Sequence, residues 1–369
     1  MNRALILALG TAICAVPLVA IAADDAKPAP AKAAPQKAAK TAPGKVPMAA
    51  DGHPDLSGFW SNATLTRETR PAALGDRLVY TPEEVKKLEN AVVEEVKEGN
   101  APTDPNAPAA APKIDPAKIR PEFAAAGGDV GGYNRGWLDP GSSVMRVHGE
   151  PRTSFLTTPN GQPPARLASV QAPRGFGRGG LGSFDNPENR SLGERCILGF
   201  GRNAGPPMLP NGFYNNNYQF VQTPESIAID VEMVHDTRII RLNSTHRTDG
   251  VRPWMGDSIG HWEGNTLVVE TTNIPQAQAY NGSWKNLKVT ERFTRDGGDR
   301  VLYQYTIDDP TTWAKPWGGE YEFYKLQGIV YEYACHEGNY ALPGMLGGAR
   351  RQEAETKAKA AGGATKGSE

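Results

Sequence analysis

Several short runs in the second half of the chain alternate apolar with polar or small residues, which is the pattern of half-buried β-strands. Ser226–Met233 and Thr237–Leu242 form the first pair of such runs. Ser258–Trp262 and Thr266–Thr272 form the second pair, and a turn at 263–265 separates them. The short polar connections predict that each pair is a β-hairpin.

Two more pairs of runs follow along the chain. Leu287–Thr294 and Val301–Ile307 flank a polar stretch, and Tyr321–Leu326 is followed by Ile329–Ala334. Closing about eight strands into an up-and-down antiparallel barrel leaves no exposed strand edges, so we expect a mainly β fold of this class. A β-sandwich is the alternative. Because such a small barrel has room for one ligand, we also expect an interior cavity.

One helix is signalled before the strand-rich region. Thr81 and Glu84 form a capping box around Pro82, and Gly99 marks the end of the helix. Between these residues, apolar side chains recur at helical spacing: Val85, Leu88, Val92 and Val96. The pattern predicts a helix over 82–98, inside a loop-rich N-terminal part that spans 51–200.

The first residues have the pattern of a secretory signal. Arg3 precedes an apolar run, Ala4–Ala22, that ends in small residues, which predicts a signal peptide over 1–22. A membrane anchor is the alternative, but Gly10 and Pro17 interrupt the run. We therefore expect a periplasmic or secreted protein without a membrane span in the mature chain.

Composition delimits the remaining segments. Residues 23–50 are mainly Ala, Pro and Lys, and this composition cannot bury enough apolar surface to offset the entropy of ordering, so it predicts a disordered tether. The tail at 347–369 is expected to be disordered for the same reason. Residues 201–346 are expected to form the barrel, in a single domain with 51–200.

The overall charge excludes one class of partner. The chain has 40 Lys and Arg residues against 41 Asp and Glu, so it offers no basic field for nucleic acid. A glycine-rich stretch at 175–180 follows no strand and precedes no helix, which argues against a phosphate-binding loop. We expect no nucleotide or other cofactor, and a small-molecule ligand or substrate as the partner.

Two cysteines remain once the signal peptide is removed, Cys196 and Cys335. An even pair in an oxidising compartment predicts a disulfide. Closing a loop of about 140 residues stabilises the fold by up to about 4–5 kcal/mol in the chain-entropy description. The alternative is a thiolate nucleophile at Cys335 beside His336, but neighbouring side chains on an extended chain point to opposite faces.

Several stretches resemble a group of uncharacterised exported bacterial proteins. They are Arg152–Ser154, Ser191–Cys196, Pro253–Ser258, Trp262–Glu270 and Tyr331–Tyr340, and the resemblance extends from about Asp51 to Arg350. It implies export and a single domain. That group has no assigned activity, so the resemblance transfers no catalytic role. The strand-turn-strand piece around Trp262 is also similar to hairpins of lipocalin-like barrels.

Histidines with nearby carboxylates are the candidates for acid–base chemistry. The candidate catalytic residues are His235, Asp236, His261, His336 and Glu337. His235 and Asp236 fall in a predicted turn, where they would face the barrel mouth unless they only satisfy the turn itself. His261 shares a strand face with Glu263 unless the turn begins there.

No tight pair of metal ligands occurs along the sequence, so we expect no metal site. Ligands from separate strands, such as His235, His261 and His336, are the alternative. The other histidines lie among polar turn residues and are expected to face solvent: His53, His148 and His246.

Aromatic and amide side chains are the candidates for substrate binding. They are Asn215, Asn216, Asn217, Trp254, Asp257 and Tyr321. Such aromatic residues line pockets for sugars, phenols and other flat ligands, although they also suit an ordinary core. Three successive asparagines suit a bend or a site and contribute little to a core.

These patterns favour an exported enzyme that acts by general acid–base chemistry on a small organic, aromatic or sugar-like substrate in the barrel. Lyase, isomerase and hydrolase reactions all fit, since each needs only a histidine and a carboxylate. The alternative is a non-catalytic periplasmic small-molecule-binding protein, and an envelope scaffold is a third possibility. Ionisable groups that converge in one cavity would favour the enzyme.

Overall fold

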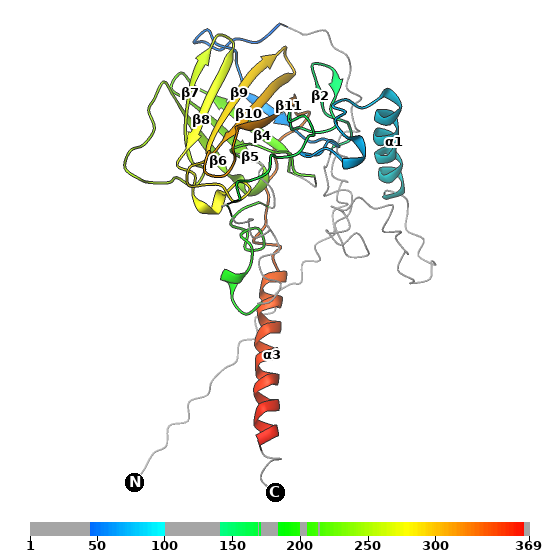
Figure 1. The fold of residues 1–369 in the computed structure, drawn as a ribbon, viewed down its shortest axis with the longest axis vertical. Helices are drawn as coiled ribbons and strands as arrows, with labels where there is room; N and C mark the ends of the chain where they lie inside the picture. The colour runs from blue at the N-terminus through cyan, green and yellow to red at the C-terminus, as the bar shows by residue number, and fades with distance from the viewer. Residues whose placement is uncertain are drawn as a thin grey trace, which may run out of the picture. The chain divides into compact units, whose positions relative to one another are not determined.

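A closed β-barrel is the core of the protein (Figure 1). The computed structural model describes residues 45–99, 141–168, 170, 184–199, 205–212 and 215–364. Around the barrel the strand order is β1-β11-β10-β9-β8-β7-β6-β5-β4, and β1 pairs with both β11 and β4. The mainly β barrel expected from the sequence is confirmed, and the sandwich alternative is wrong. The predicted signal peptide lies outside the described residues.

The barrel strands are β1 (Gly58–Ser61), β4 (Asn217–Gln222), β5 (Ser226–Val231), β6 (Thr237–Leu242), β7 (Asp257–Glu263), β8 (Thr266–Thr272), β9 (Lys288–Asp296), β10 (Arg300–Asp308) and β11 (Trp317–Lys325). A small separate sheet consists of β2 (Arg146–Val147) and β3 (Glu150–Pro151). The α-helices are α1 (Pro82–Gly99) and α3 (Ala341–Ala364). Short 3₁₀ turns are η1 (Ala72–Leu74), η2 (Pro187–Asn189), η3 (Met233–His235) and η4 (Gln276–Gln278).

Three of the predicted hairpins are confirmed. Strand β5 pairs antiparallel with β6, β7 with β8, and β9 with β10. The fourth hairpin is wrong, because β11 pairs with β10 on one edge and with β1 on the other, and residues 329–334 form no strand. With both edges of β11 occupied, no edge remains for a third strand. The barrel therefore extends beyond 201–346, since β1 lies at Gly58–Ser61.

Strands β6 and β7 run parallel, which departs from a simple up-and-down barrel. Ile240 pairs with Ser258, and Leu242 pairs with Gly260. Parallel neighbours need a crossover connection, because a tight hairpin can join only antiparallel strands. Residues 243–256 form this connection, hereafter the crossover loop.

Aromatic rings pack against one another inside the barrel. The ring centroids of Tyr303 and Tyr321 are 4.9 Å apart, those of Phe293 and Tyr303 are 5.1 Å apart, and Tyr303, Tyr321 and Phe293 are completely buried. None of the six histidines is among the buried residues. The candidate catalytic histidines therefore do not line the interior, because the inward positions of the strands carry mainly aromatic and aliphatic side chains.

The N-terminal part covers the outer face of β11. The backbone N–H of Glu322 lies 3.3 Å from the Met145 sulfur, and both residues are buried. Helix α1 is fixed to the same segment by Glu89, which forms a salt bridge with Arg146 and accepts a hydrogen bond from the Val144 N–H. The predicted helix is thus confirmed.

The start and the apolar stripe of α1 follow the sequence pattern in part. The capping box is present, since the Thr81 hydroxyl and the Glu84 carboxylate each accept a hydrogen bond from the other residue's backbone N–H, at 3.3 and 2.8 Å. Val85 and Val92 are buried, but Leu88 is 38% exposed.

Two predictions about the C-terminal region have opposite outcomes. The disulfide is confirmed, with Cα atoms of Cys196 and Cys335 5.7 Å apart, so Cys335 supplies no thiolate. The prediction of a disordered tail is wrong for residues 347–364, because they belong to helix α3. Its many Ala, Glu, Lys and Arg residues favour a helix by intrinsic propensity even though they bury little surface. Within the described residues, no helix combines the length and the apolar character needed to cross a bilayer.

Candidate functional site

One end of the barrel gathers most of the polar groups that the sequence singles out. We call it the polar end: β1, β5, β8 and β10 finish there, and β4, β6, β7, β9 and β11 begin there. The turn with His235 and Asp236 lies at this end, as do Trp254 before β7 and Asn215 to Asn217 at the start of β4. The structure thus brings this subset of the predicted site residues to one end of the barrel.

The turn between β5 and β6 has an unusual backbone. Val234 and His235 both adopt left-handed conformations, with φ of 61° and 55°. A β-branched residue in this region is strained, and such strain occurs where the surrounding structure holds a side chain in a required position. The Tyr333 N–H donates a hydrogen bond of 3.3 Å to His235 Nε2, which leaves the ring proton of a neutral imidazole on Nδ1.

Asp236 is the acidic group of this turn. The Trp254 indole N–H donates a hydrogen bond to its Oδ1 at 3.2 Å. Burial raises the pKa of Asp236 to about 6, because desolvation of the carboxylate outweighs the stabilising bond from Trp254. Asp236 therefore titrates near neutral pH, which suits a group that exchanges protons.

The three successive asparagines, Asn215 to Asn217, serve the local structure at the start of β4. Asn216 is buried, and its side chain accepts a hydrogen bond from the Asn211 N–H at 2.6 Å and donates one to the Asn211 carbonyl at 2.7 Å. Asn217 donates a hydrogen bond to Glu232. Asn215 is in the left-handed region, with φ of 56°. These amides hold the chain at the entry to β4, as the bend interpretation of the sequence implies.

The other candidate catalytic residues lie apart from this turn. His261 and Glu263 are paired at 3.3 Å, as predicted, but both are exposed and lie near the end of β7, away from the polar end. His336 and Glu337 are exposed in the segment after the disulfide. In the described part of the chain, no group of three or more His, Cys, Asp and Glu residues has the arrangement of a metal site.

Asp257 anchors the crossover loop, and nothing in its surroundings indicates a substrate-binding role. It is buried and accepts hydrogen bonds from Arg241 at 2.7 Å and from the Arg247 N–H at 2.7 Å. Burial favours the neutral acid, but these donors outweigh it and lower the pKa of Asp257. His246, expected to face solvent, is instead half-buried between Asp257 at 3.0 Å and Glu270 at 3.2 Å. The expectation is wrong because the loop folds back along the barrel wall.

A buried ion pair inside the barrel was not among the predicted site residues. Arg238 and Glu291 form two hydrogen bonds, of 2.5 and 3.0 Å, and their side chains are 1% and 0% exposed. Tyr303 donates a hydrogen bond of 2.7 Å to Glu291. Although burial opposes the charge of Arg238, the carboxylate of Glu291 raises the pKa of this guanidinium. Buried charges of this kind are retained only where they are paired.

Tyr321, predicted to bind substrate, belongs to the same interior. Its hydroxyl donates a hydrogen bond to the Met208 carbonyl at 3.0 Å and accepts one from the Asn62 amide at 3.1 Å. Burial raises the pKa of Tyr321 well above its usual value, so the hydroxyl stays protonated.

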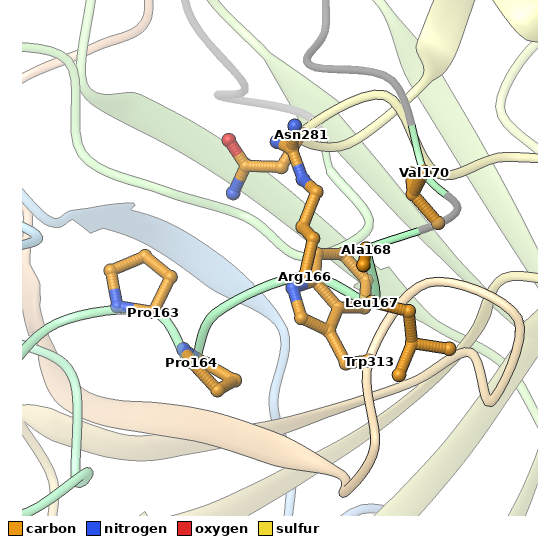
Figure 2. Close-up of a pocket in the computed structure, with 8 residues that line it drawn as sticks. All are labelled: Pro163, Pro164, Arg166, Leu167, Ala168, Val170, Asn281 and Trp313. Atoms are coloured by element: carbon orange, nitrogen blue, oxygen red, sulfur yellow. The ribbon is translucent and has the colours of Figure 1, made fainter.

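A pocket of about 460 Å³ opens at the polar end, outside the barrel interior (Figure 2). Its wall is mainly apolar: Pro163, Pro164, Leu167, Ala168, Val170 and Trp313. The polar lining consists of Arg166 and Asn281, and the Arg166 side chain is drawn extended in Figure 2. These residues belong to irregular segments, so no periodic signal could have identified the pocket.

Arg166 has no acidic partner among the residues that the structure describes. Its backbone pairs with Trp313 in an isolated bridge, but its guanidinium forms no ion pair there. Burial lowers the pKa of Arg166, since no neighbouring carboxylate offsets the desolvation. A half-buried arginine of this kind is suited to bind an anion.

Comparison with known proteins gives no assignment. No protein-family model matches the chain, and a search of the curated proteins finds no significant match. Fold and site geometry therefore carry the functional argument.

Proposed function

We propose that the protein is a non-catalytic small-molecule-binding protein that takes up a small organic anion in the Arg166 pocket. The observation that carries this proposal is a half-buried arginine without an acidic partner in the described residues, set in a wall that is apolar apart from Asn281. The predicted catalytic groups do not line this pocket, which disfavours catalysis there.

The pocket chemistry indicates what kind of anion fits. A volume of about 460 Å³ lies in the range of pockets for drug-sized ligands. A carboxylate or sulfonate would form charge-assisted hydrogen bonds with Arg166. The prolines and the edge of Trp313 would contact a flat apolar body, and the Asn281 amide would orient a polar substituent. Export through the predicted signal peptide would place this binding in the periplasm or outside the cell.

The proposal is tested with two fluorescent probes of similar shape. 8-Anilinonaphthalene-1-sulfonate carries an anion on a flat apolar body, and N-phenyl-1-naphthylamine has the same body without the charge. We expect the wild type to prefer the sulfonate, and Arg166→Gln to weaken its binding by about tenfold while leaving the neutral probe unchanged. Arg351→Gln, which removes the same charge from an exposed position on α3, is the matched control.

Equal affinity of the wild type for the two probes would contradict the proposal. So would an Arg166→Gln variant that binds the sulfonate as well as the wild type does. If the sulfonate is preferred and Arg166→Gln weakens its binding, native mass spectrometry of the protein from its own host, before and after mild denaturation, would identify the natural anion from its mass.

A second candidate function is favoured by the turn at His235 and Asp236. An acid whose pKa is about 6, next to an imidazole whose Nε2 accepts the Tyr333 N–H on a strained backbone, has the properties of a general acid–base site. In this case the protein would be a lyase, isomerase or hydrolase for a small substrate bound at the polar end.

Hydrolysis of 4-nitrophenyl acetate is a simple probe of this second function. His235→Ala and Asp236→Asn should each reduce the rate by about a hundredfold, which is typical for the loss of a general acid or base. His53→Ala, a histidine stacked on Trp262 by its ring, is the control. If the rate equals that of buffer alone, or if all variants have equal rates, this turn does not catalyse ester hydrolysis.

A further inference from the structure

Residues 205–209 form a plug at the polar end of the barrel. All five residues are buried, and Met208 is completely so. The Met208 N–H donates a hydrogen bond of 2.9 Å to the Tyr303 hydroxyl, and the Met208 carbonyl accepts one of 3.0 Å from Tyr321. A single residue of the plug thus has both of its backbone groups bound by side chains of the barrel interior.

The two tyrosine hydroxyls are oriented by the groups behind them. Tyr303 donates its proton to Glu291, so its oxygen can only accept from the plug. Tyr321 accepts from Asn62, so its proton is directed at the plug carbonyl. The interior therefore presents one fixed acceptor and one fixed donor, which match the N–H and the C=O of one amino-acid residue.

The interior also has hydrogen-bonding capacity that the plug does not use. Among the described residues, Asn62 Oδ1, Arg238 Nε and the Tyr305 hydroxyl are buried without a hydrogen-bond partner. A buried polar group destabilises the fold when it is left unpaired, so several of them in one interior require an explanation. A molecule with more polar groups than the plug would use them.

The charge of the interior limits the chemistry of such a molecule. Arg238 and Glu291 neutralise each other through two hydrogen bonds. An anion or a cation would therefore enter without a counter-charge, at a large desolvation cost. The aromatic rings of Tyr303, Tyr321 and Tyr218 surround the polar groups and favour an apolar side chain.

We propose that the polar end of the barrel interior is a binding site for a neutral peptide-like amide with an apolar side chain, and that Met208 occupies this site as an internal ligand. This site is distinct from the Arg166 pocket, because its ligand is uncharged and it is lined by other residues. The plug would have to leave for an external amide to bind, so binding and plug release are coupled.

The probe is N-acetyl-methioninamide, which carries the same N–H, C=O and side chain as Met208. Met208→Gly removes the side chain of the internal ligand, so the plug competes less well for the site. This variant should bind the probe at least about tenfold more tightly than the wild type does. In this background, Tyr303→Phe should lower the affinity about tenfold, because the acceptor is lost. Tyr324→Phe removes a hydroxyl that bonds to Arg146 on the outer face, and it should change nothing.

Two comparison ligands define the chemistry. N-acetyl-methionine, which has a free carboxylate, and N-acetyl-glycinamide, which has no side chain, should both bind Met208→Gly more weakly than the probe does. Arg166→Gln should not affect binding of the probe, so failure of this site and failure of the anion pocket give different results.

Hydrogen exchange of the wild type tests whether the plug can leave, and it applies even if Met208→Gly does not fold. With the probe in excess, the amide hydrogens of Gly205, Met208 and Leu209 should exchange faster than without it; Pro206 and Pro207 have no amide hydrogen. Unchanged exchange in this segment would overturn the proposal. The same holds for a folded Met208→Gly variant that binds the probe no better than the wild type, or whose affinity is unaffected by Tyr303→Phe.

Discussion

Glu291 is completely buried, and its carboxylate receives hydrogen bonds from Arg238 and Tyr303. Glu291→Gln would leave the charge of Arg238 uncompensated inside the barrel, and we expect it to lower the free energy of unfolding by about 3–5 kcal/mol. Urea denaturation measures this loss. Replacing both partners with apolar residues, Arg238→Met with Glu291→Leu, should cost less than the single change, and the reverse order would contradict the argument.

The contribution of Asp236 to the free energy of unfolding decreases as the pH rises, which is the reverse of the usual behaviour of a carboxyl group. Its pKa is about 6 in the folded protein, above the ordinary value of 3.8, so the folded state binds the proton more tightly. The stability from this group is complete below pH 4 and is lost as the pH rises to 6 and above. Asp236→Asn should therefore melt at a higher temperature than the wild type at pH 8.

At pH 4 the same comparison should show almost no difference, because the wild-type carboxyl is then protonated as well. Thermal melts of both proteins at the two pH values check this. Glu225→Gln, at an exposed position in the turn before β5, serves as a control for the general effect of removing a negative charge. A larger stabilisation at pH 4 than at pH 8 would show that Asp236 is not desolvated.

The buried ion pair could be predicted from the strand pattern, whereas the pocket could not. Arg238 lies on the same alternating phase as Ile240, and Glu291 lies on the same phase as Val289. Opposite charges on the apolar phases of two strands indicate a buried pair. Arg166 has no such context, because it belongs to an irregular segment whose neighbours in space are distant along the chain.

At the scale of elements, the crossover loop depends on the buried carboxylate at its end. Asp257→Asn removes the charge that Arg241, His246 and the Arg247 N–H all contact, and it should cost about 2–3 kcal/mol at pH 7. Because the pKa of Asp257 is lowered in the folded protein, this stability is present above pH 3.8 and is lost as the pH falls further. Denaturation at pH 7 and at pH 3 measures both effects.

The difference between Asp257→Asn and the wild type should therefore shrink in acid. A constant difference across this range would contradict the assignment. Asp249→Asn, on an exposed part of the same loop, should be nearly neutral at both pH values, because its ion pair with Arg247 lies in solvent.

Local patterns predict three of the hairpins and α1 correctly, because each of these is specified by neighbouring residues. They failed for β1, which has only four residues, Gly58–Ser61, too few to show an alternation. Without β1, the free edge of β11 was assigned to the next apolar run. The parallel pairing of β6 with β7 was missed for a similar reason, since a hairpin pattern contains no information about a crossover.

At the scale of the whole molecule, the disulfide joins the segment before β4 to the segment after β11. Cys196 and Cys335 are 139 residues apart in the chain. Closing so long a loop contributes about 4–5 kcal/mol in the chain-entropy description, so Cys196→Ser should lower the melting temperature by about 10 °C under oxidising conditions. Addition of a reductant should lower the melting temperature of the wild type to that of Cys196→Ser. Equal melting of the wild type with and without reductant would contradict this contribution.

The position of β1 has a consequence for how the chain is made. Trp60 pairs with Tyr218 on one side and with Lys325 on the other, so the first strand to be synthesised receives its second partner only when β11 has emerged. A product of interrupted translation that stops before Trp317 would leave both β1 and β10 with bare edges. Such edges pair with those of other chains, so incomplete copies of this protein should aggregate rather than persist as smaller folded forms.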